Sequence, residues 1–297
     1  MSEIIINMPV QIKNDQSSFE FLICDLYHKI INIKNSKIIL NFKKTRWLEA
    51  NLTSVLGSIF TVISKNNNEL WIKSINNSIK KVLVKNEFYK NFGIDIELED
   101  TYQSTIKYTR FVPEDKVKFQ KYLKEEFIPK INLQMSEDFD KELRLNLEEV
   151  FQNARTHGKC EYIFVCGQYF YANKKVTFTI VDLGKTIPEN VKNKLQTDIN
   201  DVDCIDWATK DGNSTKVGIS GGIGLFQLSE FLKENEGKMQ IISAYGYWEQ
   251  DNKNIIKHIL DTPFYGTIVN IQVNINDKFY LSLEEKSTLN QFIGNIF

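Results

Sequence analysis

The sequence predicts a mixed α/β and α+β protein in two units, with residues 1–93 forming the first unit and residues 136–297 the second. The first unit alternates short β-branched runs with apolar stripes of helical period, which is typical of a parallel sheet flanked by helices. The second combines a long amphipathic helix, a predicted hairpin and two late strands, which favours helices on a mostly antiparallel sheet. We expect the polar segment 94–135 to connect the units and to pack on the second.

The elements of the first unit follow one another as strand, helix, strand and helix. A β-branched run at 37–42 predicts a buried strand. Residues 47–64 carry apolar side chains at helical spacing, and residues 66–74 indicate a turn and a second strand. We expect a second helix over 78–93, closed by Gly93, because glycine readily adopts the left-handed conformation that ends helices.

The connecting segment and the start of the second unit predict strands and helices in turn. Residues 104–112 indicate a strand and residues 114–128 a helix. A long helix over 136–157 follows, and then a hairpin whose strands span 162–171 and 175–182. The alternation of β-branched and aromatic residues in the hairpin supports the strand assignment.

The rest of the second unit is organised around a glycine cluster. A polar segment at 186–221 leads into the cluster, and the helix that follows it ends near Gly237. Two further strands are predicted at 238–246 and 266–274.

Composition limits the classes of protein to which this chain can belong. Its 297 residues are 42% hydrophobic and 25% charged, which argues against disorder. The formal net charge of −1 gives no overall basic surface, so nucleic acid is not indicated as a partner. We expect no membrane span and no leader, because no apolar run approaches roughly 18 residues. The four cysteines lack zinc-site spacing, so we expect free thiols and a cytoplasmic location.

Four glycines between Gly218 and Gly224 precede a predicted helix. The cluster does not fit the dinucleotide pattern, whose sixth position is here Gln227, or the P-loop, because no Gly-Lys-Ser/Thr ends it. The Gly-x-Ser-x-Gly spacing around Ser220 lacks the buried strand that precedes a hydrolase nucleophile. A flexible segment leading into a helix N-terminus remains, which is either a phosphate site or a plain turn.

Polar side chains at three other places could complete a site. Glu149 and Asn153 lie one turn apart on the long helix, away from its apolar stripe. A carboxylate can deprotonate water and an amide oxygen can bind Mg²⁺, whereas a solvated helix face is the plain alternative. Asp182 and Gly184 end a predicted strand, and Thr267 opens the last one. A carboxylate at a strand end can accept a hydrogen bond from an exocyclic amine such as that of adenine.

The order of these motifs resembles the GHKL, or Bergerat-fold, ATPase superfamily, which includes gyrase-type ATPases, Hsp90, histidine kinases, MutL and the anti-sigma-factor serine kinases. The resemblance covers residues 136–275, where EEVFQNARTHG, VDLGKTIP and GGIGLFQLSEFLKENEG are similar to the N, G1 and G2 boxes of the family. The stretch NARTHG is most similar to the anti-sigma-factor kinases. The resemblance implies a Bergerat-fold α/β sandwich that binds ATP and Mg²⁺.

The resemblance also implies roles for individual residues. Glu149 takes the general-base position and Asn153 the Mg²⁺-ligand position. Asp182 takes the adenine-recognising position, supported by Thr267. Further contacts to the nucleotide are implied for residues of the three boxes and of the loop between them: His157, Gly184, Thr186, Lys216, Gly222, Ile223, Gly224 and Leu225.

Two consequences follow for the segment around the nucleotide. The G1 box usually reads Asp-x-Gly-x-Gly, and Thr186 replaces its last glycine, so we expect the nucleotide to sit differently or to hydrogen-bond to this hydroxyl. The resemblance makes residues 189–221 a mobile lid over ATP. Lys210 and Lys216 are candidates to reach the phosphates from this lid, although exposed loop lysines are the plain alternative.

The stretch IILNFKKTRWLEANLTSVLGSIFTVI, residues 38–63, resembles a STAS domain, the fold of the anti-sigma-factor antagonists that the kinases named above phosphorylate. Laying the family's Asp-Ser-Ser-Gly-Leu motif over residues 49–53 places Asn51 at the phosphoacceptor serine. An asparagine cannot accept a phosphoryl group, and we expect Thr53 and Ser54 to be ordinary helix residues. Residues 1–93 are therefore expected to form a STAS-like regulatory or docking domain that has lost its acceptor.

Three functions remain open from the sequence. The first is a Mg-ATP-binding ATPase or switch coupled to the STAS-like unit, in stress signalling, a toxin–antitoxin system or phage defence. The second is a serine/threonine kinase that acts on a separate partner, and the third is a nucleotide-dependent interaction module that does not hydrolyse. A histidine kinase is disfavoured, because no two-helix segment with a phosphoacceptor histidine precedes the ATPase-like region. A protein partner is expected, and the dimers common in the family leave a homodimer open.

Overall fold

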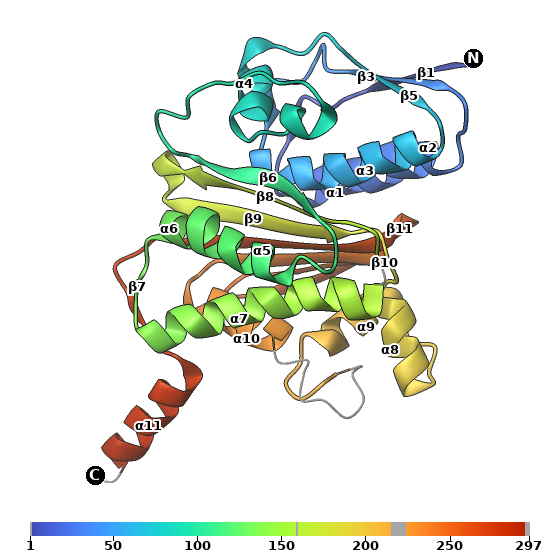
Figure 1. Ribbon diagram of the computed structural model, residues 1–297. Helices are drawn as coiled ribbons and strands as arrows, with labels where there is room; N and C mark the ends of the chain where they lie inside the picture. The colour runs from blue at the N-terminus through green and yellow to red at the C-terminus, as the bar shows by residue number, and fades with distance from the viewer. Residues whose placement is uncertain (1, 159, 215–223, 295–297) are drawn as a thin grey trace.

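A five-stranded antiparallel sheet with helices on both faces organises the structure (Figure 1). The computed structural model describes residues 2–158, 160–214 and 224–294, and the side chains of these residues except 157, 158 and 290–294. The strand order is β10-β11-β9-β8-β6. The strands are β6 (Thr105–Phe111), β8 (Ile163–Phe170), β9 (Lys175–Asp182), β10 (Lys238–Gln250) and β11 (Ile255–Asn274). The fold is thus mixed α and β, as predicted.

The first unit forms a separate three-stranded parallel sheet in the order β1-β3-β5. The predicted strands at 37–42 and 66–74 correspond to β3 and β5, whereas β1 was not predicted. The elements of this unit are β1 (Glu3–Asn7), β2 (Gln11–Ile12), α1 (Gln16–Glu20), η1 (Phe21–Tyr27), α2 (His28–Ile31), β3 (Lys37–Asn41), β4 (Trp47–Leu48), η2 (Ala50–Leu52), α3 (Thr53–Lys65), β5 (Glu69–Lys73), α4 (Asn77–Lys85) and η3 (Tyr89–Phe92).

Two helices of the first unit are shorter than predicted. The helix predicted from residue 47 begins at Thr53, because Trp47 and Leu48 form β4, which pairs with β2. Glu49 N, just after β4, donates to Ile12 O (2.9 Å), a bond that extends this pairing. The second predicted helix ends at Lys85, and Gly93, with a φ of 77°, closes the short η3 instead.

Helices of the second unit cover one face of the five-stranded sheet (Figure 1). The predicted helices at 114–128 and 136–157 and the helix after the glycine cluster are all present. The remaining elements are α5 (Lys116–Tyr122), η4 (Leu123–Phe127), α6 (Ile128–Ile131), β7 (Gln134–Met135), α7 (Glu137–Asn153), η5 (Ala154–Gly158), η6 (Tyr171–Asn173), α8 (Ile187–Leu195), α9 (Asp201–Ala208), α10 (Gly224–Glu234), β12 (Phe279–Tyr280) and α11 (Leu283–Gly294).

The segment predicted as a lid, residues 189–221, contains more regular structure than expected. Most of α8 and the whole of α9 lie within it. Cys204 and Ile205 of α9 are fully buried, and Trp248 Nε1 on β10 donates to Asp206 Oδ1 (3.0 Å). Helix α9 is therefore packed against the sheet, which shortens the part of this segment that could act as a lid.

The two faces of the sheet contribute to two different cores. Phe178 and Ile271 pack with α5, α7 and α10. The opposite face carries Phe164 and Ile268, which share a core with α3 and the other helices of the first unit. The first unit thus closes one face of the sheet of the second. Among the described residues, no helix has the length and apolar character needed to cross a lipid bilayer.

The shared core predicts that both units lose stability together. Ile268 on β11 is fully buried (0% exposed) in this core. We expect Ile268→Ala to lower the free energy of unfolding by about 2–5 kcal/mol, because a cavity replaces the lost side chain. Native-state hydrogen exchange at globally protected amides of β3 and of β9 should report the same decrease.

Ile5→Ala is the control, because Ile5 on β1 is 56% exposed. It should change the free energy of unfolding by less than about 0.5 kcal/mol. A loss of protection confined to β9 in Ile268→Ala would show that the first unit does not depend on this core.

Candidate functional site

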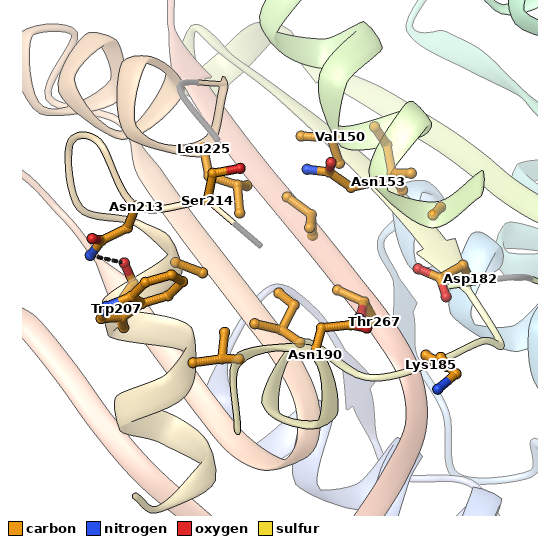
Figure 2. A pocket seen from close by; sticks show the side chains of 16 residues that line it. Val150, Asn153, Asp182, Lys185, Asn190, Trp207, Asn213, Ser214, Leu225 and Thr267 are labelled. Carbon is orange, nitrogen blue, oxygen red and sulfur yellow. Dashed lines mark hydrogen bonds between the residues drawn. The ribbon is translucent and has the colours of Figure 1, made fainter. Parts of the chain in front are cut away.

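A pocket lies on the face of the sheet that α7 covers, among α7, the end of β9, the inner part of β11, and helices α8, α9 and α10 (Figure 2). It encloses about 800 Å³ of space, its open mouth included. The side chains that line it come from segments far apart in the sequence: Val150, Asn153, Ala154, Ile180, Asp182, Lys185, Ile187, Asn190, Val191, Trp207, Ala208, Asn213, Ser214, Leu225, Thr267 and Val269. Four predicted site residues, Asn153, Asp182, Leu225 and Thr267, therefore meet in one cavity.

The N-cap of α7 fixes where the helix begins, and its buried apolar stripe fixes its rotation. Together they place Asn153 at the pocket. Ser136 caps the helix by accepting a hydrogen bond from Phe139 N (3.1 Å). Leu147 and Phe151 are buried in the core beneath, which fixes the rotation of the helix. Asn153 is the last α-helical residue before a π-helical turn, and its half-buried side chain faces the cavity (Figure 2).

Glu149 lies beside the pocket and contacts the start of α10. Its Oε2 accepts a hydrogen bond from Gly224 N (2.9 Å), the first backbone amide of that helix. A side chain at position 224 would place its Cβ 2.8 Å from the Cβ of Glu149, so only glycine allows this approach. The carboxylate thereby satisfies one of the unpaired N–H groups at the positive end of the helix dipole.

Asp182 ends β9 as a buried carboxyl group. It is 5% exposed, and its Oδ1 accepts a hydrogen bond from Gly184 N (3.0 Å). Burial raises the pKa of this carboxyl to about 7, because the low-polarity surroundings disfavour the charged form, while the bond from Gly184 acts in the opposite direction. Asp182 is thus an acceptor facing the cavity whose charge state is unusually sensitive to what lies next to it.

The pairing of β9 with β11 places Thr267 directly opposite Asp182. Gly266 makes the close approach feasible, since a Cβ there would lie 2.1 Å from the carbonyl oxygen of Asp182. Ser243 on β10 supports the same corner. Its Oγ lies 3.1 Å from Thr267 Oγ1 and accepts a hydrogen bond from Ile187 N (2.9 Å) at the start of α8.

The rest of the cavity is largely apolar. Ile180 and Val269 form its sheet side, and Val150, Leu225 and Trp207 contribute from the surrounding helices. An apolar cleft with a few convergent polar groups suits a flat ligand that carries hydrogen-bonding edges. Trp207 was not predicted as a site residue. It lies in the polar segment before the glycine cluster, and the presence of a tryptophan in such a polar segment was the available signal in the sequence.

Of the other residues implied by the family resemblance, some line the pocket and some have a structural role beside it. Leu225 lines the pocket, whereas the contribution of Gly184 is its backbone N–H. Thr186 caps α8, because its Oγ1 accepts a hydrogen bond from Glu189 N (3.1 Å), and Lys185 beside it lines the cavity instead.

Several residues expected to contact the phosphates belong to the part of the chain that the structure does not describe. Lys216, Gly222 and Ile223 lie outside the described residues, as does the side chain of His157. Lys210 is described: its Nζ lies 3.4 Å from Asp206 Oδ1, and it is not among the residues that line the pocket.

A metal ion could bind at this site only together with a phosphorylated molecule that supplies further ligands. Within the described ranges, no group of three or more His, Cys, Asp or Glu side chains could hold a metal. Asn153 nevertheless offers an amide oxygen in the cavity, and Mg²⁺ is often held by one or two protein ligands together with phosphates and water. The residues present therefore fit a cation that arrives with a phosphorylated ligand.

Comparison with known proteins adds no family assignment. No protein-family model matches the chain, and no curated protein is significantly similar to it in sequence. A functional interpretation therefore depends on the motifs and on the geometry of the pocket.

The raised pKa of Asp182 predicts how stability changes with pH. The carboxyl titrates near its usual 3.8 in the unfolded chain and near 7 in the folded protein. Between these values the folded state holds a proton that the unfolded state has lost, so the stability that this group contributes at low pH is lost as the pH rises to about 7. Asp182→Asn retains the acceptor for Gly184 N but cannot ionise. We expect its stability relative to the wild type to be greater at about pH 8 than at about pH 5, as measured by urea denaturation.

An identical difference between the two proteins at both pH values would contradict this assignment. Asp251→Asn serves as the control, because Asp251 lies in the exposed turn between β10 and β11 and the pKa of its carboxyl is lowered by hydrogen bonds from Lys253 N and Asn254 N.

Proposed function

We propose that the protein is a nucleotide-dependent switch of the GHKL type, which binds Mg-ATP in the pocket described above. The observation that carries the proposal is the meeting of Asn153, Asp182 and Thr267 in one cavity beside the start of α10. Asn153 and Asp182 belong to the segments that resemble the N and G1 boxes, and Thr267 lies on β11, so the three residues come from a helix and two strands that are distant in the sequence. A chance resemblance of motifs would not require them to share a site.

The residues would divide the work of holding the nucleotide. Asp182 accepts a hydrogen bond from the exocyclic amine of adenine, and Thr267 lies next to it to complete that edge. The apolar side chains of Ile180 and Val269 provide a surface for the ring. Asn153 holds the Mg²⁺, which when bound neutralises phosphate charge. Glu149 orients and deprotonates the attacking water.

The burial of residues 51–54 favours a regulatory role for the first unit over the role of a phosphorylation substrate within the same chain. Asn51, at the position that the STAS resemblance implies for the phosphoacceptor, is fully buried against the sheet. It bonds to Thr179, whose neighbour Ile180 points to the opposite face and lines the pocket. Thr53 and Ser54 are buried too. We therefore propose a STAS-like regulatory domain docked on the back of a Bergerat-fold sheet.

A kinase acting on a separate chain remains the second candidate. The pocket opens on the side away from the first unit, so a partner could approach it without displacing that unit. A module that binds nucleotide without hydrolysis is the third. Phosphate release and label transfer to a partner distinguish the three.

Nucleotide binding is tested first with Asp182→Asn. We expect the wild type to bind an ATP analogue in the presence of Mg²⁺, measured by calorimetry. The variant should bind it roughly 10–100-fold more weakly, because a carboxylate–amine hydrogen bond is replaced by one to a neutral amide that also presents an NH₂ group. Asp251→Asn should bind as the wild type does. Equal affinity of Asp182→Asn for the analogue would remove Asp182 from the site.

Hydrolysis is tested with Glu149→Gln. We expect phosphate release to fall by about 100-fold or more, because the general base is lost while its shape is retained. Glu142→Gln is the control. Glu142 lies two turns earlier on α7 and accepts a hydrogen bond from Leu283 N (3.0 Å), away from the pocket. Undiminished release in Glu149→Gln would exclude Glu149 as the base, and binding without any release would favour the interaction module.

A further inference from the structure

A chain of buried hydrogen bonds crosses the face of the sheet that points away from the pocket. It begins at Asn51 in η2, just before α3. The side chain of Asn51 is fully buried. Asn51 Nδ2 lies within hydrogen-bonding distance of Thr179 Oγ1 on β9 (2.8 Å) and Asn270 Oδ1 on β11 (2.9 Å). Thr179 Oγ1 donates in turn to Asn270 Oδ1 (2.6 Å). The first unit is thereby joined to two strands of the sheet.

The chain continues to the edge strand β10. Asn270 Nδ2 donates to Gln240 Oε1 (2.7 Å), and Gln240 Nε2 donates to Glu249 Oε2 (2.7 Å). The carboxylate of Glu249 also forms an ion pair with Lys238 (2.8 Å). The donors all point the same way, from Asn51 toward Glu249. Hydrogen bonds in such a series polarise one another, so a change at one end is felt along it.

Glu249 lies in the part of β10 that braces two helices. Trp248 Nε1, one residue before it, donates to Asp206 Oδ1 (3.0 Å) on α9. Gln250 Nε2, one residue after it, donates to Ser229 O (3.0 Å) on α10. The hydrogen-bond chain therefore ends between the contacts that hold α9 and α10 to the sheet.

These two helices form walls of the pocket. Trp207 on α9 and Leu225 on α10 line the cavity, and Gly224 N at the start of α10 donates to Glu149. In the sequence, α9 precedes the glycine cluster and α10 follows it. Any shift of the β10 segment around Glu249 would change how these helices close on a ligand.

Asn51 itself offers two hydrogen-bonding arrangements. Its Nδ2 has two hydrogens but three acceptors within reach, since Asn14 Oδ1 of the first unit lies 2.7 Å away in addition to Thr179 and Asn270. In one kind of arrangement the two hydrogens serve Asn14 and either of the two strands, and in the other they serve both strands, while Asn14 Nδ2 keeps its bond to Asn51 Oδ1 (3.3 Å). A group with two discrete arrangements is what coupling between distant sites requires.

We propose that Asn51 is a positioning residue through which the first unit sets the placement of α9 and α10, and so the affinity of the pocket for nucleotide. The affinity part rests on the proposed function, whereas the placement of the helices does not. Because coupling between sites is reciprocal, nucleotide would equally change how firmly the first unit is held.

The test is Asn51→Asp, which keeps the shape of the side chain but removes both donor hydrogens. We expect hydrogen exchange in α9 (201–208) and α10 (224–234) to become about tenfold faster in the protein without nucleotide, because their bracing weakens. Affinity for a fluorescent ATP analogue should fall about fivefold. Gln240→Met, which removes the link between Asn270 and Glu249 with little change in volume, should produce the same two changes and replaces Asn51→Asp if that variant does not fold.

Ser58→Ala is the matched control. Ser58 is also fully buried in α3 and donates to Val55 O (2.8 Å), outside the chain. It should leave both the exchange of α9 and α10 and the affinity unchanged. In the double variant Asn51→Asp/Gln240→Met, the second substitution should add little to the first, because both interrupt one series.

The outcomes separate this proposal from the proposed function. Faster exchange confined to residues near 47–55, or fully additive effects of the two substitutions, would overturn the positioning role even if nucleotide binds. A wild-type protein that binds no nucleotide would refute the proposed function, and the exchange of α9 and α10 alone would then decide whether the chain positions these helices.

Discussion

The structure depends on a sheet whose two faces are both buried. The helices around α7 cover one face and the first unit covers the other. Because the covered strands do not meet water, their polar side chains need partners within the protein. Thr179, Asn270 and Gln240 on the first-unit side are at most 1% exposed, and Asn51 and Glu249 complete their hydrogen bonds. The first unit is therefore part of the packing of the sheet.

Burial on the other face gives the pocket its chemistry. The close approach of β9 and β11 at Gly266 brings Thr267 opposite Asp182, while Ile180 and Val269 keep the surroundings apolar. A carboxyl group in such a place favours a ligand that brings its own hydrogen-bond donor, since water is largely excluded. In the proposed function, the preference for the edge of adenine would arise from the same packing that stabilises the fold.

Local patterns in the sequence predicted much of this arrangement. The helical stripe that buries Leu147 also predicts where Asn153 points, and the strand that ends at Asp182 was recognisable from its β-branched residues. Contacts between distant segments could not be predicted in this way. The sequence overlay placed Asn51 at a phosphoacceptor position, whereas its partners Thr179 and Asn270 lie 128 and 219 residues further along. Helices α8 and α9 were missed because both are short and lie in a segment, 186–221, that is polar as a whole.

The contact between Glu149 and Gly224 has a consequence for how an anion would enter. The amide that begins α10 already has a negatively charged neighbour. A phosphate that arrives there must exchange places with this carboxylate, so the net gain in free energy is the difference between two anions at one helix end. The same exchange would release Glu149 from the helix. In the proposed function, arrival of the phosphate would then separate Glu149, the proposed base, from α10. In the empty pocket Glu149 would stay bound to Gly224 N.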